Sequence, residues 1–192
     1  MIIEAYKLRD REVLKTIDKT KPGWYLWLAD DNSLKKLLSS KYLNNSYYES
    51  IKPYLSTKEI NNKIYYYIYV GIAVRESLNE RLNWHVNQHH LKSSVESGYL
   101  STLRQSLSSL IACDQYNEEE TNIFIDTLLI EYYSIDLPIK SNEAKQMIED
   151  IEHQELTNKT LPINLKDNKN TCVKEFLKEL SFLRKQSKKI GK

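Results

Sequence analysis

The sequence predicts an α/β or α+β fold in which helices flank a small sheet. Three apolar segments rich in aromatic and β-branched residues are typical of strands, and amphipathic segments with helical periodicity lie between them. The 192 residues include 41% hydrophobic and 28% charged residues, a balance that favours a folded domain over a disordered chain. No repeat or low-complexity linker divides the sequence, so we expect one domain over residues 1–192.

The first half of the chain alternates segments with helical and strand-like patterns. Spaced apolar residues among charges predict a helix before the turn signal at 21–23, and the short aromatic run after that turn predicts a strand. A run rich in Tyr, Ile and Val predicts the second strand, after a polar, irregular segment at 44–62. In chain order we expect a helix at 2–19, a strand at 24–29, a helix at 34–43, a strand at 64–74 and a helix from 77 to about 90.

The second half is expected to be mostly helical. Segment 121–133 predicts a third strand, although its pattern also allows a helix, and Pro138 ends the element. Asn142 is expected to be the N-cap of an amphipathic helix, which leads into an extended segment at 161–164. The predicted helices of this half span residues 101–111, 143–156 and 173–186.

Neither a membrane span nor a disulfide framework is expected. No apolar run approaches the ~20 residues that cross a bilayer, and the N-terminus becomes charged at Glu4, unlike a signal peptide. Cys113 and Cys172 lie far apart and have neither CxxC nor zinc-site spacing, which indicates reduced thiols. We therefore expect a cytoplasmic protein.

A cluster of basic residues ends the chain. The net charge of +2 neither requires nor excludes a nucleic-acid partner, so the distribution of charge is more informative than its sum. Basic residues without an acid among them suit phosphate contacts through counterion release, whereas the alternative is a solvated tail that aids solubility. The cluster comprises Arg184, Lys185, Lys188, Lys189 and Lys192.

The helix predicted from residue 77 places a fixed cation and two imidazoles on one face. Arg81, His85 and His89 are spaced i, i+4 and i+8. Arginine offers a planar fork suited to phosphate, and histidine transfers protons near neutral pH. Two alternatives are a solvent-facing polar stripe and a His85–His89 zinc pair, for which the sequence offers no third ligand nearby.

Tyrosines near glycines and acids on one helix could complete a site. The chain has 14 tyrosines and only four glycines, and most of the tyrosines are expected to pack in the core. Tyr25, just after Gly23, and Tyr69, just before Gly71, are better candidates for function because glycine permits close approach of other groups. In the helix at 143–156 one carboxylate near the sheet could hold Mg²⁺, and composition does not select which one.

Two triplets resemble the paired signature of the GIY-YIG nuclease superfamily. They are Gly23-Trp24-Tyr25 and Tyr69-Val70-Gly71, each at a predicted strand. Trp24 and Val70 stand at the middle positions, where the family has isoleucine, and both are apolar strand residues. The resemblance extends over residues 23–164, which we take as the core of the domain.

Three further elements of the same family follow in the expected order. Arg81 and His85 resemble the family's arginine helix, and Glu152 followed by Pro162 and Asn164 is similar to its closing segment. Single triplets would be weak, but five elements in order are specific.

The resemblance implies a small, mainly antiparallel three-stranded sheet flanked by helices. Its strands would lie at 24–29, 64–74 and 123–133. Residues 89–140 would contain an inserted helical and strand elaboration, and the N-terminal helix and the basic C-terminal helix would be appended to the core.

The resemblance also implies metal-dependent hydrolysis of phosphodiester bonds. The cofactor would be Mg²⁺ or Mn²⁺, held by Glu152, with Glu149 as the alternative ligand. Arg81 would stabilise charge on the phosphate in the transition state, and Tyr25 would accept the proton of the attacking water. Supporting roles would fall to Tyr69 and His85 in orienting the reactants, Arg75 in assisting phenol ionisation, Asn164 in positioning, and Gly23 and Gly71 in the signature triplets.

We therefore expect a Mg²⁺-dependent endonuclease that acts on double-stranded DNA in a restriction or other defence system. Added helices without a visible separate DNA-binding domain are similar to restriction enzymes of the superfamily, and a catalytically silent DNA-binding adaptor is the alternative. Arg184, Lys185, Lys188 and Lys189 would contact DNA. Cutting two antiparallel strands favours a homodimer, for which the helix at 101–111 is either interface material or an ordinary core helix.

Overall fold

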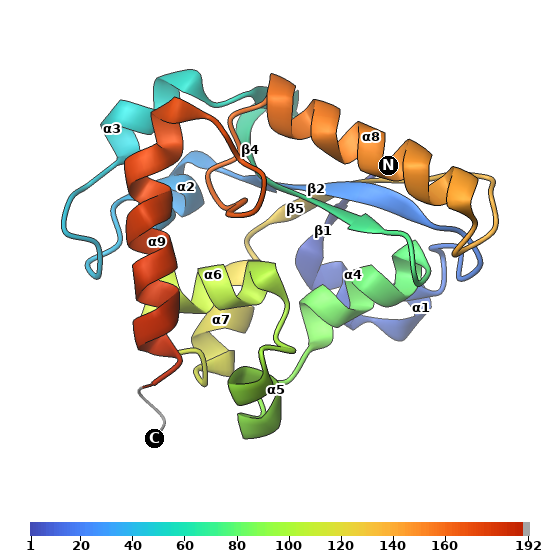
Figure 1. The fold of residues 1–192 in the computed structure, drawn as a ribbon, viewed down its shortest axis with the longest axis horizontal. Helices are drawn as coiled ribbons and strands as arrows, with labels where there is room; N and C mark the ends of the chain where they lie inside the picture. The colour runs from blue at the N-terminus through green and yellow to red at the C-terminus, as the bar shows by residue number, and fades with distance from the viewer. Residues whose placement is uncertain (190–192) are drawn as a thin grey trace.

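The centre of the fold is an antiparallel sheet of five strands in the order β1-β5-β2-β4-β3 (Figure 1). The structure is a computed structural model and describes residues 1–189. The three strands expected from the sequence are β2, β4 and β5, and they lie side by side in the sheet. The strands are β1 (Ile2–Glu4), β2 (Gly23–Ala29), β3 (Thr57–Ile60), β4 (Lys63–Ala73) and β5 (Leu129–Ser134).

The expectation of three strands is wrong because two short edge strands extend the sheet. β1 pairs with β5 through Ile2↔Glu131 and Ile3↔Ile130. β3 forms a hairpin with β4, whose two-residue loop is Asn61-Asn62 with both residues at positive φ. Two-residue hairpin loops require positive φ, and asparagine tolerates it. The Asn61-Asn62 pair is therefore a sequence signal for a hairpin turn, at the end of the segment 44–62 that was expected to be irregular.

Helices and short 3-10 turns surround the sheet. The α-helices are α1 (Arg11–Leu14), α2 (Asp31–Leu38), α3 (Tyr48–Ile51), α4 (Leu78–Asn87), α5 (Lys92–Ser97), α6 (Thr102–Ala112), α7 (Glu118–Ile125), α8 (Asn142–Asn158) and α9 (Lys174–Ser187). The 3-10 turns are η1 (Ala5–Arg9), η2 (Lys52–Tyr54) and η3 (Thr171–Val173).

Two predicted elements are replaced by shorter ones. Residues 2–19 are not one helix, because Ile2–Glu4 joins the sheet as β1 and Asp10 caps a separate short helix by accepting from the backbone N–H of Glu12. Segment 121–133 is a strand only in its second part. Its first part belongs to α7, which Asn117 caps and which begins with three acids that favour the positive end of the helix dipole.

The N-cap of α8 also differs from the expectation by one residue. The side chain of Ser141, rather than Asn142, accepts a hydrogen bond from the backbone N–H of Ala144. Asn142 is the first residue of the helix.

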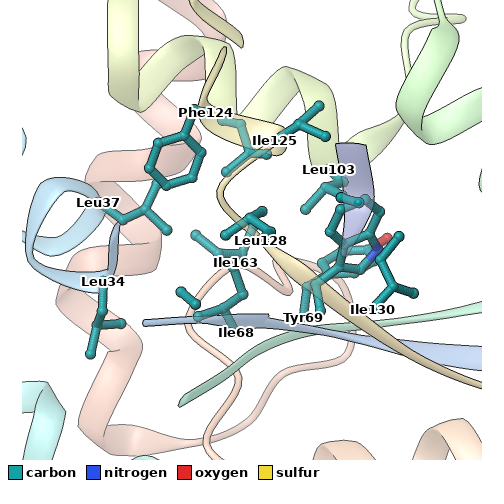
Figure 2. Close-up of a cluster of buried hydrophobic side chains, with 14 of the residues drawn as sticks. Leu34, Leu37, Ile68, Tyr69, Leu103, Phe124, Ile125, Leu128, Ile130 and Ile163 are labelled. Carbon is teal, nitrogen blue, oxygen red and sulfur yellow. The ribbon is translucent and has the colours of Figure 1, made fainter. Parts of the chain in front are cut away.

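Helices cover both faces of the sheet, and side chains alternate between two cores. In β2, Tyr25, Trp27 and Ala29 pack in the larger core, whereas Leu26 and Leu28 pack in a smaller one together with Leu156 of α8. Figure 1 shows α8 along one face, with α4, α6 and α7 on the opposite side. In the larger core, labelled side chains of the sheet (Ile68, Tyr69, Ile130) lie beside those of α2, α6 and α7 (Figure 2).

The segment after α8 covers the free edge of β4. The short strand β3 pairs with residues 63–66 only, which leaves the rest of β4 without a neighbouring strand on that side. The N–H of Ile163 donates to the carbonyl of Ile68 at 3.0 Å. The side chain of Asn164 accepts from the N–H of Val70 at 2.8 Å and donates to its carbonyl at 2.9 Å. The side chain of Asn164 thus satisfies the backbone groups of Val70 that a neighbouring strand would otherwise bond. It also fastens the segment after α8 to β4.

None of the helices within residues 1–189 combines the length and the apolar character needed to cross a membrane.

Candidate active site

A solvent-accessible hollow of about 280 Å³ gathers side chains from β2, β4, α4 and α8. It also receives the connection between α5 and α6. All five residues expected to carry the chemistry lie in it. Its lining comprises Tyr25, Tyr69, Gly71, Ile72, Arg81, Trp84, His85, Gly98, Tyr99, Leu100, Thr102 and Glu152.

The phenol of Tyr25 is placed by two glycines. Tyr25 lies opposite Gly71 in the β2–β4 register, and a Cβ on Gly71 would collide with the Tyr25 ring and hydroxyl. Gly23 faces β5, where a Cβ would collide with the backbone carbonyl of Tyr133. Any side chain at Gly71 would therefore displace the phenol, and any side chain at Gly23 would push β2 away from β5.

Tyr25 is hydrogen-bonded to His85. The distance from Tyr25 Oη to His85 Nε2 is 2.6 Å, and both side chains are buried. The imidazole lies within 6.5 Å, centroid to centroid, of four aromatic rings, which fix its orientation. These rings belong to Tyr25, Trp27, Tyr69 and Trp84.

Burial controls the protonation of this pair. It lowers the pKa of His85 well below its usual value, and the cations Arg81 and Arg104 lower it further, so the imidazole is neutral. Burial raises the pKa of Tyr25 well above 10, with Tyr69 adding to the shift and Arg81 opposing it. At neutral pH the resting pair is a phenol bonded to an uncharged imidazole, whose Nδ1 has no hydrogen-bond partner among residues 1–189.

Arg81 is held against the side of the hollow by two neighbours. Its Nη2 atom pairs with Glu76 at 2.6 Å, and its guanidinium carbon lies 4.8 Å from the centroid of the Trp84 ring. The buried Nε atom of Arg81 has no hydrogen-bond partner within the described part of the chain. The guanidinium is therefore oriented but retains donor capacity for an anion in the hollow.

Glu152 is the acid of α8 that faces the hollow. It lines the hollow and is partly buried, whereas Glu149 is exposed and lies 3.9 Å from Lys145. Burial raises the pKa of Glu152 above 4.5, an effect that Lys166 opposes and Asp167 reinforces. The geometry therefore distinguishes two acids that the sequence left as alternatives.

The hollow suits a hard divalent cation that keeps most of its waters. Within residues 1–189, no cluster of three or more His, Cys, Asp or Glu side chains could enclose a metal. Mg²⁺ is commonly bound by one or two carboxylates, water and substrate phosphate. A single carboxylate at the wall of an open hollow meets that requirement. It does not meet the requirement of a closed zinc site, which needs four protein ligands.

Comparison with known families decides what this arrangement is. A family model described as a GIY-YIG catalytic domain matches residues 23–186. The chain belongs to the GIY-YIG nuclease superfamily. Neither the curated proteins nor the solved structures gave a match to the chain. The matched range extends beyond the core expected at 23–164 and includes most of α9.

The two GIY-YIG triplets lie on neighbouring antiparallel strands. Gly23 pairs with Ala73, and Tyr25 pairs with Gly71. The ring of Trp24, at the first departure from the family pattern, stacks on Tyr133 of β5 with centroids 4.9 Å apart. Tryptophan is therefore accommodated on the face of β2 opposite Tyr25.

Three further residues named from the sequence lie outside the hollow. Arg75 is exposed on the turn after β4 and does not line the hollow. His89 lies beyond the end of α4, is 74% exposed and bonds Glu118 at 2.9 Å, so neither the three-residue face nor the His85–His89 zinc pair forms. The side chain of Asn164 makes both of its hydrogen bonds to the backbone of Val70, so of its two expected roles the contacts agree with positioning the segment after the Glu152 helix.

Arg104 is a buried residue of the GIY-YIG domain that sequence reasoning missed. From α6 it donates to the carbonyl of His85 at 2.9 Å and to that of Val86 at 3.2 Å, at the end of α4. Its Nε donates to His90 at 2.8 Å. A cation is stabilising at a helix C-terminus, so Arg104 anchors the turn that carries His85. The sequence signal for this role was an arginine, Arg104, placed among the apolar residues of the helix predicted at 101–111.

The basic cluster is mostly part of a helix rather than a free tail. Arg184 and Lys185 belong to α9, and Lys188 and Lys189 follow it. Arg184 is partly buried and donates to the side chain of Gln105 at 2.5 Å. Lys185, Lys188 and Lys189 line a groove with Glu96, and Lys192 lies outside the described residues.

Proposed function

We propose that this protein is a Mg²⁺-dependent endonuclease that hydrolyses DNA phosphodiester bonds in the hollow around Tyr25. The observation that carries the proposal is the 2.6 Å hydrogen bond between Tyr25 Oη and Nε2 of the neutral His85, beside Arg81 and Glu152. The family match supports a nuclease, and the metal, the DNA substrate and a restriction or defence role are our proposals.

The Tyr25–His85 pair provides a path for the proton of the attacking water. Tyr25 Oη accepts the water proton while its own proton passes to His85 Nε2, so the phenol is never left as a free phenolate. The neutral imidazole is ready to accept a proton, and the cost of charging it in a buried position is offset by negative charge that develops on the phosphate. Tyr69 bounds the same space and restricts where the water can lie.

Arg81 and Glu152 face the phosphate from other walls of the hollow. Arg81 donates to a non-bridging oxygen, with Glu76 and Trp84 holding its plane. Glu152 would hold the Mg²⁺, which when bound neutralises charge on the phosphate oxygens. Burial of these groups strengthens their interactions with the developing charge.

Plasmid cleavage tests the proposed function. Purified protein is incubated with supercoiled plasmid in Mg²⁺ or in a chelator, and the product ends are sequenced. We expect nicked or linear DNA in Mg²⁺ only, with ends at one defined sequence if the role is restriction. Binding without any cleavage in Mg²⁺ or Mn²⁺ would instead favour the silent adaptor.

Arg81→Lys is expected to slow cleavage by about 10²-fold, the magnitude of one lost transition-state donor. Lysine keeps the charge but loses the planar fork and its stacking on Trp84. Single-turnover rates measure the effect, and melting temperatures check the fold. A wild-type rate in this variant would exclude a phosphate-binding fork at Arg81.

Simultaneous replacement of Lys185, Lys188 and Lys189 by Ala is expected to weaken DNA binding at every sequence without moving the cut site. Each phosphate contact contributes roughly 0.9 to the slope of log K against log salt, so the slope should fall by about 2 to 3. The control variant replaces Lys35, Lys36 and Lys41, which removes the same charge elsewhere. A changed cleavage sequence would show that the basic groove reads bases.

A homodimer is expected when both DNA strands are cut, because one hollow offers one set of groups for one phosphate. The interface does not lie on α6, whose residues Leu103, Leu107 and Leu110 are buried in the core. Light scattering with and without DNA measures the stoichiometry. A strict monomer that cuts both strands in one binding event would contradict the expectation.

A further inference from the structure

The loop between α5 and α6 lines the hollow and carries an exposed tyrosine, Tyr99. Gly98, Tyr99 and Leu100 line the hollow that also contains Arg81 and Glu152. Gly98 has a φ of 78°, which favours glycine and turns the chain sharply. The next two side chains then diverge, because Leu100 is 2% exposed and anchors the loop, whereas Tyr99 is 75% exposed.

Two glutamines hold the backbone of this loop. Gln88 donates to the carbonyl of Tyr99 at 2.9 Å and accepts from the N–H of Ser101 at 2.8 Å. Gln105 donates to the carbonyls of Gly98 and Leu100, and its side-chain oxygen accepts from Arg184. The N–H of Leu100 also donates to the carbonyl of Ser94 at 3.1 Å. The loop is therefore fixed to α4, α5, α6 and α9, although the ring it carries faces solvent.

The exposed ring of Tyr99 has no identified role in the fold. Its hydroxyl has no hydrogen-bond partner among residues 1–189, and its backbone contacts do not depend on the side chain. A large aromatic group held in water on a fixed backbone loses little entropy when it binds a flat ligand. Beside a site for phosphodiesters, the flat ligand that fits is a nucleobase.

We infer that Tyr99 stacks on the nucleobase next to the scissile phosphate. This inference rests on the proposed function and adds a substrate class to it. A base exposes its face to a protein ring only after it leaves the duplex stack, so the substrate strand is locally unpaired or opened at the cut. The chain is therefore a nuclease that cuts beside an unstacked nucleotide, with Tyr99 as the residue that holds that nucleotide.

The experiment combines Tyr99 variants with DNA that lacks a single base. The substrate is a duplex that carries the cleavage site mapped on plasmid, with an abasic nucleotide at each position flanking the cut in turn. Tyr99→Ala, Tyr99→Phe and the control Tyr54→Ala are compared with wild type by single-turnover kinetics at several protein concentrations. Tyr54 is 60% exposed and lies in η2, away from the hollow.

On intact DNA, Tyr99→Ala is expected to lower the efficiency of cleavage about 5- to 150-fold, the range of one lost base–aromatic stack. Tyr99→Phe should keep the wild-type rate, since the ring and not the hydroxyl makes the contact. At one flanking position the abasic substrate should slow wild type by a similar factor and leave Tyr99→Ala unaffected, because both changes remove the same interaction.

Two results would overturn the inference. One is a Tyr99→Ala rate within about twofold of Tyr54→Ala, and the other is an abasic effect that is equal in wild type and Tyr99→Ala at every position. Either result with an active wild type removes only the stacking role. Failure of wild type to cleave any DNA would remove the proposed function itself.

Discussion

Tyr25→Phe is expected to slow cleavage by about 10²- to 10⁴-fold, the range for loss of a general base. The substitution removes one oxygen atom, which is bonded to His85 and which we propose as the acceptor for the water proton. The ring, the packing against Gly71 and the charge of the site all remain. We expect DNA binding to be unchanged, because in the proposed mechanism the lost atom contacts the water rather than the phosphate.

Tyr67→Phe is the matched control for this substitution. Tyr67 lies in β4, is buried, and bonds Glu131 at 2.7 Å on the face of the sheet opposite Tyr25. Each variant loses one buried hydrogen bond, which costs roughly 1 kcal/mol of stability. Single-turnover rates and melting curves separate the two effects. If Tyr25→Phe cleaves as fast as Tyr67→Phe, the hydroxyl of Tyr25 does not accept the proton of the attacking water.

Glu152→Gln is expected to abolish cleavage, with a loss of at least about 10³-fold, since the amide would remove the anionic ligand that we propose for Mg²⁺. Glu149→Gln is the control on the same helix and should cleave at close to the wild-type rate. In wild type, cleavage should fall as the pH drops through the raised pKa of Glu152, which lies above 4.5. A rate lost in Glu149→Gln and kept in Glu152→Gln would transfer the metal ligand to Glu149.

Glu152→Gln should also make the protein more stable at neutral pH. A carboxyl whose pKa is raised by folding contributes stability below its unfolded value, and this contribution is lost as pH rises through the folded value. The glutamine amide stays neutral throughout, so the variant's melting temperature should exceed that of wild type at pH 7. The difference should vanish below pH 4.5.

The sequence predicted the centre of the fold because the three central strands are rich in aromatic, β-branched and other apolar residues. The edges were missed because β1 has three residues and β3 has four, too few for an alternating pattern to stand out. The sequence of α7 favours a strand over the helix that it also allows because its buried residues Phe124 and Ile125 are β-formers, whereas the feature that marks a helix is the Asn117 cap before the acidic first turn.

The site residues could be named from the sequence because they lie in short motifs, but their surroundings could not. Tyr25 and Gly71 are 46 positions apart, and only the strand register shows that one makes room for the other. Arg104 and Glu76 act through contacts with the end of α4 and with Arg81, which depend on how helices pack. His89 was expected on the same face as His85 because the end of α4 could not be placed from the sequence.

The most direct test measures binding and cleavage of the same labelled duplex by wild type and Glu152→Gln. Binding is followed by anisotropy in a chelator, and cleavage is followed by gel after Mg²⁺ is added. We predict equal or tighter binding by Glu152→Gln, since a negative charge beside phosphate is removed, and cleavage by wild type alone. Wild-type protein that binds the duplex and never cuts it, or Glu152→Gln that cuts at the wild-type rate, would contradict a metal-dependent nuclease centred on this hollow.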